Sequence, residues 1–155
     1  MRLSELETRI PPLIVLVACA ALAWACAAAL PGRPLEWPLQ GALASLLLAC
    51  GVGLSLASKL AFQRADTTLN PMRPENVSAL VTTGLYRWTR NPMYLGQALI
   101  LLAWAVVVDR PVAFLAVPLF VAYITRFQIQ PEEVVLSRRF PGMYAAFCER
   151  TRRWI

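Results

Sequence analysis

Arg90-Asn91-Pro92-Met93-Tyr94-Leu95-Gly96 joins a basic segment to the apolar run 93–108, at a point where an apolar helix would leave water. Pro92 suits the first turn of a helix, where its missing amide hydrogen costs little. A second polar stretch follows downstream, with Glu132-Glu133 and the ending Arg152-Arg153-Trp154-Ile155. We expect these two stretches to fold over each other at one face of a membrane and to form a pocket there.

The composition predicts an integral membrane protein. Of the 155 residues 58% are hydrophobic and 15% are charged, and the mean hydropathy is +0.54. Soluble domains are about half apolar and about one quarter charged. The excess apolar residues come in blocks close to the ~20 residues that cross a bilayer as a helix. We therefore expect one all-α membrane domain that covers residues 1–155.

The apolar blocks predict four transmembrane helices, at about residues 10–30, 39–62, 92–108 and 111–127. The second block contains Gly51-Val52-Gly53, for which close packing between membrane helices is the first explanation. Residues 128–155 should form a tail of short helices that caps the pocket. Pro131-Glu132-Glu133 suits a helix start, where carboxylates oppose the positive end of the helix dipole, and Pro141-Gly142 should interrupt the tail.

Basic residues predict the orientation of the chain. All of them except Arg33 and Arg110 fall in the amino terminus, in the segment 59–90 or in the region from residue 126 onward. Cytoplasmic flanks of membrane helices carry an excess of Lys and Arg. We expect a multi-pass protein of the cell (inner) membrane, with both termini and the pocket on the cytoplasmic side.

Several classes of function are disfavoured. The net charge of +6 lies at the ends of apolar blocks, and no nucleic-acid-binding motif is present, so no nucleic-acid partner is expected. The chain has no histidine and no C-x-x-C pair, which argues against a metal site. No Asp or Glu lies within an apolar block, whereas proton-coupled transporters usually keep one there.

Arg90 and the two glutamates could together hold a zwitterion. A helix start offers free amide hydrogens to an anionic group, with Arg90 beside it, while Glu132 or Glu133 could take an amine. The simpler explanation is an arginine that anchors a helix and glutamates that only complement a dipole. These residues alone favour the simpler explanation.

The order and spacing of several short motifs add a resemblance to a known family. The motifs are Thr83-Gly84-Leu85-Tyr86, the stretch from Arg90 to Gly96, Glu132-Glu133-x-x-Leu136, Phe140, Tyr144 and Arg153-Trp154, with Thr67-Thr68-x-x-Pro71 upstream. Over roughly residues 60–155 the chain resembles the isoprenylcysteine carboxyl methyltransferases, membrane enzymes related to phosphatidylethanolamine N-methyltransferases.

This resemblance implies S-adenosylmethionine as methyl donor and a lipophilic acceptor from the bilayer, either a prenylcysteine-like carboxylate or a phospholipid amine. It implies catalytic roles for Arg90, Asn91, Tyr94 and Glu133. The cofactor-binding residues that it implies are Tyr86, Arg90, Asn91, Pro92, Met93, Tyr94, Gly96, Glu132, Glu133, Tyr144 and Arg153. Gly96 would leave room for the cofactor, and Arg153 with Trp154 would close or anchor the lid.

Departures from the family pattern leave the acceptor open. Asn91 stands where the prenylcysteine enzymes have histidine, and Gln128 stands where they have an arginine. If that arginine orients a substrate carboxylate, its replacement argues against carboxyl methylation, and Asn91 is closer to the phospholipid enzymes. The alternative function is a non-catalytic membrane subunit or small transporter that retains the fold. The sequence does not specify an oligomeric state.

Overall fold

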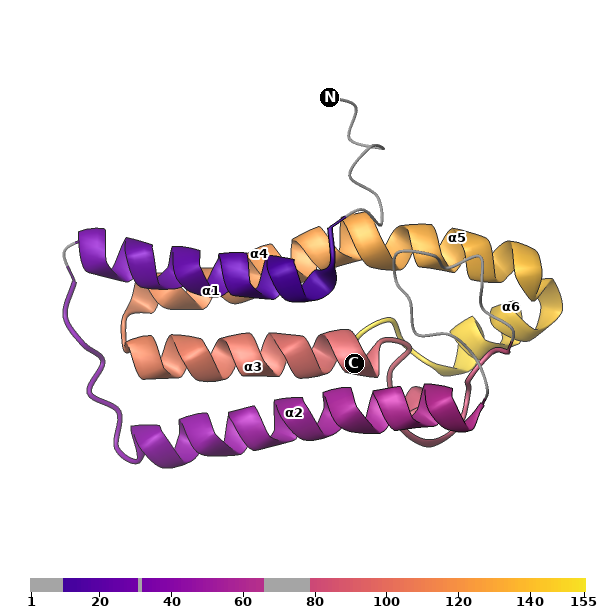
Figure 1. The fold of residues 1–155 in the computed structure, drawn as a ribbon, viewed down its shortest axis with the longest axis horizontal. Helices are drawn as coiled ribbons and strands as arrows, with labels where there is room; N and C mark the ends of the chain where they lie inside the picture. Colours follow the sequence, from indigo (N-terminus) through magenta and orange to yellow (C-terminus); the bar gives the residue numbers. More distant parts are fainter. Residues whose placement is uncertain (1–9, 31, 66–78) are drawn as a thin grey trace, which may run out of the picture.

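The computed structural model describes residues 10–30, 32–65 and 79–155, and every regular element within them is a helix (Figure 1). Thr67, Thr68 and Pro71, which contribute to the family resemblance, lie outside the described residues. Four elements cross the long dimension of the molecule: α1 (Pro12–Ala29), α2 (Gln40–Arg64), α3 (Pro92–Val108) and a last helical run from Pro111 to Arg139.

The prediction of an all-α membrane protein is confirmed. By length and composition α1, α2 and the run Pro111–Arg139 can each cross a membrane, and α3 is a shorter apolar helix of 17 residues. Large apolar side chains are exposed on the outer faces of these helices, including Leu13 at 62%, Trp24 at 61% and Leu46 at 62%. Exposed apolar surface of this kind is stable against lipid and costly in water.

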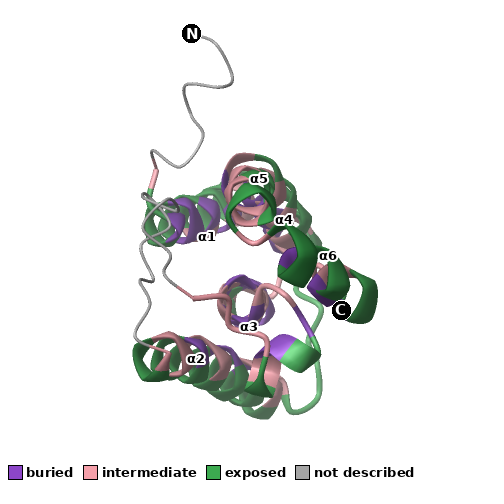
Figure 2. Cartoon of the chain, turned by 90° about the vertical axis from the view of Figure 1, so that its right-hand side faces the viewer, coloured by how far each residue is buried: buried purple, intermediate pink, exposed green. Residues whose placement is uncertain are grey.

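The central helix is α3, which lies between α2 on one side and α1 with α4 on the other (Figure 2). Its buried residues include Tyr94, Ala98, Leu101 and Ala105, which form one side of the core. The other side of the core comes from α1 and the last helical run, through Val15, Leu16, Cys19, Ala23, Phe120, Ile124 and Ile129. The Arg90–Gly96 stretch contains the first turn of this central helix, so the core fixes the position of that stretch.

Two glycines bring α2 and α3 into backbone contact. A methyl group on Gly51 would come within 2.6 Å of the Gly96 carbonyl oxygen, and one on Gly96 within 2.5 Å of the Gly51 carbonyl oxygen. Neither position has room for a side chain, as expected for close helix crossings in membranes. Gly53 has nothing within 4 Å of an added methyl group, so it lies off this contact.

The last helical run continues into the tail without the separate start that was predicted at Pro131. It passes from η4 (Pro111–Leu115) through α4 (Ala116–Ile124) and the π-helical turn η5 (Thr125–Ile129) into α5 (Gln130–Arg139). The Gln130 amide donates to the Thr125 carbonyl, and Pro131 has no amide hydrogen to satisfy. Glu132 and Glu133 lie in the first turn of α5, as predicted, but this turn follows the π-helical turn without a break, so few free amides remain beside them.

The predicted interruption at Pro141 is confirmed. Phe140 leaves the helical conformation, and α6 (Pro141–Arg150) begins directly after it. The short helix η3 (Gly84–Arg87) precedes α3 and begins at Gly84, whose φ of +63° is strained for other residues. With α5, α6 and the last residues of the chain, η3 lies at the end of the bundle that carries the start of α3 (Figure 1).

Candidate active site

The carboxyl-terminal residues 151–154 are bound to the start of α3. The Arg90 amide donates to the Arg152 carbonyl at 2.9 Å, and the Asn91 side-chain amide donates to the Arg153 carbonyl at 2.9 Å. The Thr89 hydroxyl donates to the same Arg153 carbonyl at 3.3 Å. Asn91 thus acts here as a clamp on the tail, and the two polar stretches that the sequence singled out do meet.

Arg153 and Arg90 converge on Glu133. The Arg153 guanidinium donates to both oxygens of the Glu133 carboxylate, at 3.0 and 2.7 Å, and Arg90 Nη2 lies 3.5 Å from Oε1. The hydrogen bond to Glu133 raises the pKa of Arg153 above its ordinary value. Bidentate charge-assisted pairs are among the strongest polar contacts in proteins, so this cluster joins α5, the tail and the start of α3.

Arg90 has unused hydrogen-bonding capacity. Its side chain is 15% exposed, and its Nη1 also donates to Cys148 Sγ on α6. Its Nε is buried and has no hydrogen-bond partner in the part of the chain that the structure describes. A buried donor without a partner is costly, so this nitrogen is a candidate for a hydrogen bond to a bound ligand.

Glu132 faces the bundle instead of the tail. Its Oε1 accepts a hydrogen bond from the Tyr94 hydroxyl at 2.6 Å, and Tyr94 is 4% exposed. Consecutive residues of a helix point about 100° apart, so Glu132 and Glu133 reach different neighbours. The pair that looks equivalent in the sequence is therefore divided between two surroundings.

Tyr86 and Tyr144 border the same region. Tyr86 is hydrogen-bonded to Ser58 of α2, and its ring meets Phe62 edge-on at a centroid distance of 5.5 Å. Burial raises the pKa of both phenols, and the nearby charges of Glu132 for Tyr86 and Glu133 for Tyr144 raise them further. Both hydroxyls remain protonated at neutral pH, which leaves them able to donate hydrogen bonds.

The remaining predicted residues lie at the first turns of α3. Pro92 is buried at its first position, and Met93 is half-buried. Gly96 contacts Gly51 and Ser55 of α2, which gives a packing reason for a glycine at this position. Its predicted role in making room for a cofactor stays a prediction, as do the ligand roles of the other residues.

Three residues at this end were not singled out from the sequence. Thr89 clamps the tail, Ser58 is completely buried and bonds Tyr86, and Cys148 contacts Arg90. Isolated Ser, Thr and Cys residues carry no spacing signal, because the partners named here lie more than 25 positions away in the sequence. A polar residue one helical turn from the end of an apolar block is the only hint, and it applies to Ser58.

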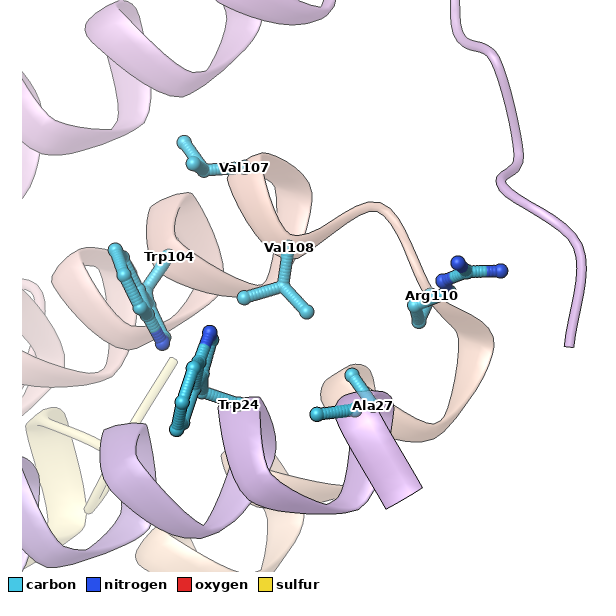
Figure 3. A pocket seen from close by; sticks show the side chains of 7 residues that line it. Trp24, Ala27, Trp104, Val107, Val108 and Arg110 are labelled. Atoms are coloured by element: carbon cyan, nitrogen blue, oxygen red, sulfur yellow. The ribbon is translucent and has the colours of Figure 1, made fainter. Parts of the chain in front are cut away.

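A hollow at the opposite end of the bundle is lined mainly by apolar side chains. It has a volume of about 370 Å³ and lies between α1 and α3, bounded by Trp24, Ala27, Trp104, Val107 and Val108. Figure 3 shows that the Arg110 guanidinium points away from the two tryptophan rings. Tryptophans at the end of a span are typical of the membrane interface. No convergent polar groups point into this hollow, so we do not assign chemistry to it.

Comparison with known proteins gives two matches. Residues 39–142 match the phospholipid methyltransferase family. A curated protein of Haemophilus influenzae, named only as uncharacterized, is 40% identical over 63 residues, which are 41% of this chain and 100% of that protein. No solved structure matches the chain. The matched range contains η3, α3 and α5, with Arg90, Tyr94, Glu132 and Glu133, and ends before Tyr144 and Arg153.

Proposed function

This chain belongs to the phospholipid methyltransferase family, and from that premise we propose that it transfers the methyl group of S-adenosylmethionine to the headgroup amine of a membrane lipid. The observation that carries the proposal is the convergence of Arg90, Glu133 and Arg153 beside the Tyr94–Glu132 pair at one end of the bundle. These groups come from the segment before α3, from α3 itself, from α5 and from the tail, which only the fold brings together.

The side chains at this end fit the chemistry of S-adenosylmethionine. That molecule carries a carboxylate, an ammonium group and ribose hydroxyls, which require a cation, an anion and hydrogen-bonding groups. Arg90, with its unpartnered Nε, would take the carboxylate, and Glu133 would take the ammonium or a ribose hydroxyl. Tyr86, Asn91, Pro92, Met93, Tyr94 and Tyr144 would border the cofactor.

Bound S-adenosylmethionine supplies a methyl group that its sulfonium has already activated. The protein then has to align the acceptor and exclude water, which can contribute a large part of the rate enhancement. Asn91 and Thr89 hold the tail over the start of α3, and Trp154 donates from its indole to the Thr125 hydroxyl at 3.1 Å. In this proposal the tail closes the site toward water while the helices leave it open toward lipid.

Gln128 favours an amine over a carboxylate as the acceptor. It is fully buried, and its amide nitrogen donates to the Ile10 carbonyl at 2.8 Å, before the start of α1. The Gln128 amide nitrogen thus helps to fix the start of α1, and the side chain carries no positive charge for a substrate carboxylate. The site end also carries most of the basic residues, which supports the proposed cytoplasmic placement of both termini and the site in the inner membrane.

Incubation of the detergent-purified protein with methyl-labelled S-adenosylmethionine and a total lipid extract tests the proposal. We expect label in a lipid whose headgroup contains an amine. Label in a carboxyl ester would contradict the amine assignment alone. A folded protein that neither binds the cofactor nor transfers label would instead support the alternative of a non-catalytic membrane subunit or small transporter.

A further inference from the structure

One amide side chain lies within the apolar helix α3. Gln97 is the only Asn or Gln between Pro92 and Val108, and residues 98–108 after it carry no charge and no amide. Its Oε1 is buried and has no hydrogen-bond partner in the part of the chain that the structure describes. An unpaired polar group is costly within a membrane span, and polar residues there are rare. Gln97 is therefore a candidate for contact with a ligand.

Gln97 lies next to the proposed site on the surface of α3. It follows Met93 by four residues and Tyr94 by three, and residues at these spacings are neighbours on a helix. Because α3 begins at the site end (Figure 1), Gln97 lies about 4.5 Å further along the helix axis than Tyr94, toward the far end. Gln97 thus borders the proposed cofactor region on the side toward the middle of the membrane span.

The contacts that hold α3 between its neighbours do not use the Gln97 carbonyl. Gly96 meets Gly51 of α2, and Gln97 is rotated from Gly96 by about 100° around the helix. Two turns further along the face of Gln97, Trp104 donates to the Ala20 carbonyl of α1 at 3.0 Å. Packing on α2 and on α1 is thus accounted for by other residues, and the Gln97 carbonyl has no structural partner.

A neutral carbonyl oxygen requires a hydrogen-bond donor from its ligand. The primary ammonium of an amine lipid offers N–H bonds, and every methyl transfer replaces one of them with a methyl group. A quaternary ammonium keeps the positive charge but has no N–H bond left. An amide carbonyl can therefore distinguish the two headgroups, because only the first can donate to it.

We propose that the Gln97 carbonyl accepts a hydrogen bond from an N–H of the acceptor headgroup and so selects lipids that can still be methylated over the fully methylated product. This inference rests on the function proposed above. It adds a residue that the cofactor does not require, since Arg90 and Glu133 are assigned to the charged groups of S-adenosylmethionine.

The expected selectivity follows from the unpaired carbonyl. A site that is built to hydrogen-bond an N–H group rejects an analogue that lacks it, because the buried acceptor is then left without a partner. The fully methylated lipid returns Gln97 to this state, which favours release of that product. Gln97 acts here on specificity, and no proton or methyl group passes through it.

The test measures the affinities of short-chain phosphatidylethanolamine and short-chain phosphatidylcholine for the detergent-purified protein. S-adenosylhomocysteine is present, because it has no methyl group to transfer. Wild type should bind the first lipid at least about tenfold more tightly than the second. In Gln97→Met, which keeps the length of the side chain and removes the carbonyl, this ratio should fall to about threefold or less, with cofactor affinity within about threefold of wild type.

Gln63→Met is the matched control, since Gln63 is exposed near the end of α2. It should keep the wild-type ratio of lipid affinities. If Gln97→Met does not fold, Gln97→Asn takes its place, because it keeps the amide and withdraws the carbonyl by one methylene group. The ratio should then fall at least about threefold. An unchanged ratio in a folded variant would contradict the inference, since a purely structural amide would not set this ratio.

The remaining outcomes separate this inference from the proposed function. Wild-type protein that binds no cofactor contradicts the proposed function. Wild-type protein that binds the cofactor and methylates lipid, but has equal affinities for the two lipids, contradicts only the role of Gln97. A loss of cofactor affinity in Gln97→Met with an unchanged lipid ratio would assign Gln97 to the cofactor and would also overturn the inference.

Discussion

The two ends of the helical bundle use their polar side chains in different ways. At the far end, both carboxylate oxygens of Asp109 accept from backbone amides, at 3.2 Å from Leu35 and 3.3 Å from Glu36. Gln40 donates to the Val106 carbonyl at 2.7 Å, and Arg110 donates to the Gly32 carbonyl. Side chains there satisfy the backbone where helices end and loops turn, which is a structural task.

At the site end, charged side chains mainly meet other charged or polar side chains. Arg90, Glu133 and Arg153 form one cluster, Tyr94 and Glu132 form another, and Arg90 Nε has no partner among the described residues. A buried guanidinium nitrogen without a hydrogen-bond partner requires an explanation, and a bound ligand is one. The far end thus stabilises the fold, whereas we propose that the site end receives a ligand.

The largest expected effect is a loss of S-adenosylmethionine affinity that occurs for a variant at the site end and not for one at the far end. Arg90→Ala should weaken S-adenosylmethionine binding by about 100-fold, because a charge-assisted contact to the ligand carboxylate is worth about 1.5–3 kcal/mol. Isothermal titration calorimetry measures the affinity. Arg110→Ala is the matched control at the far end, and equal loss of affinity in both variants would contradict the division between the ends.

The next effect concerns the contact between α2 and α3, which fixes the position of the site end. Gly51→Ala places a methyl group 2.6 Å from the Gly96 carbonyl and should lower the free energy of unfolding in detergent by about 1–3 kcal/mol. Gly53→Ala is the control, since that position is open. Thermal denaturation should show a lower midpoint for Gly51→Ala alone.

The third effect is a loss of stability, without a change in ligand binding, for a variant at the far end. Asp109→Ala removes the acceptors of two backbone amides, and we expect a loss of about 1 kcal/mol in the free energy of unfolding. Cofactor affinity should stay within twofold of wild type. A larger change in affinity would show that the far end takes part in the site.

The smallest effect at neutral pH concerns the tyrosines of the site end. Burial raises the pKa of Tyr86 and Tyr144, so the folded protein holds these protons more tightly than the unfolded chain. Their contribution to stability is complete below about pH 10 and is lost as the pH rises further. Thermal midpoints measured from pH 7 to 11 should fall at the alkaline end, and less steeply in Tyr86→Phe/Tyr144→Phe.

Much of the fold could be predicted because apolar blocks report on membrane helices directly. The observed starts and ends of α1, α2 and α3 lie within about two residues of the predicted ones. The sequence did not reveal that α4 continues into α5. Pro131 follows a polar residue, and the same pattern occurs both at the start of a separate helix and after a π-helical turn. The π turn holds one extra residue, which changes the face that every later residue presents.

The site was harder to predict in detail, for a related reason. The sequence places Glu132 and Glu133 together, but only the face of α5 decides which of them meets Arg153 and which meets Tyr94. Asn91 and Thr89 both bind the tail through a backbone carbonyl. Every residue has such a carbonyl, so the sequence cannot show which one accepts these hydrogen bonds. Sequence patterns identified the stretches that meet, and the fold determined the individual contacts.

The most direct test of the central claim is equilibrium binding of S-adenosylmethionine to the folded, detergent-purified protein and to Glu133→Ala. We predict saturable one-site binding by wild type and at least about tenfold weaker binding by the variant, which loses the carboxylate between Arg90 and Arg153. Absence of binding to folded wild-type protein, or equal affinity in both proteins, would contradict the assignment of the cofactor to this end of the bundle.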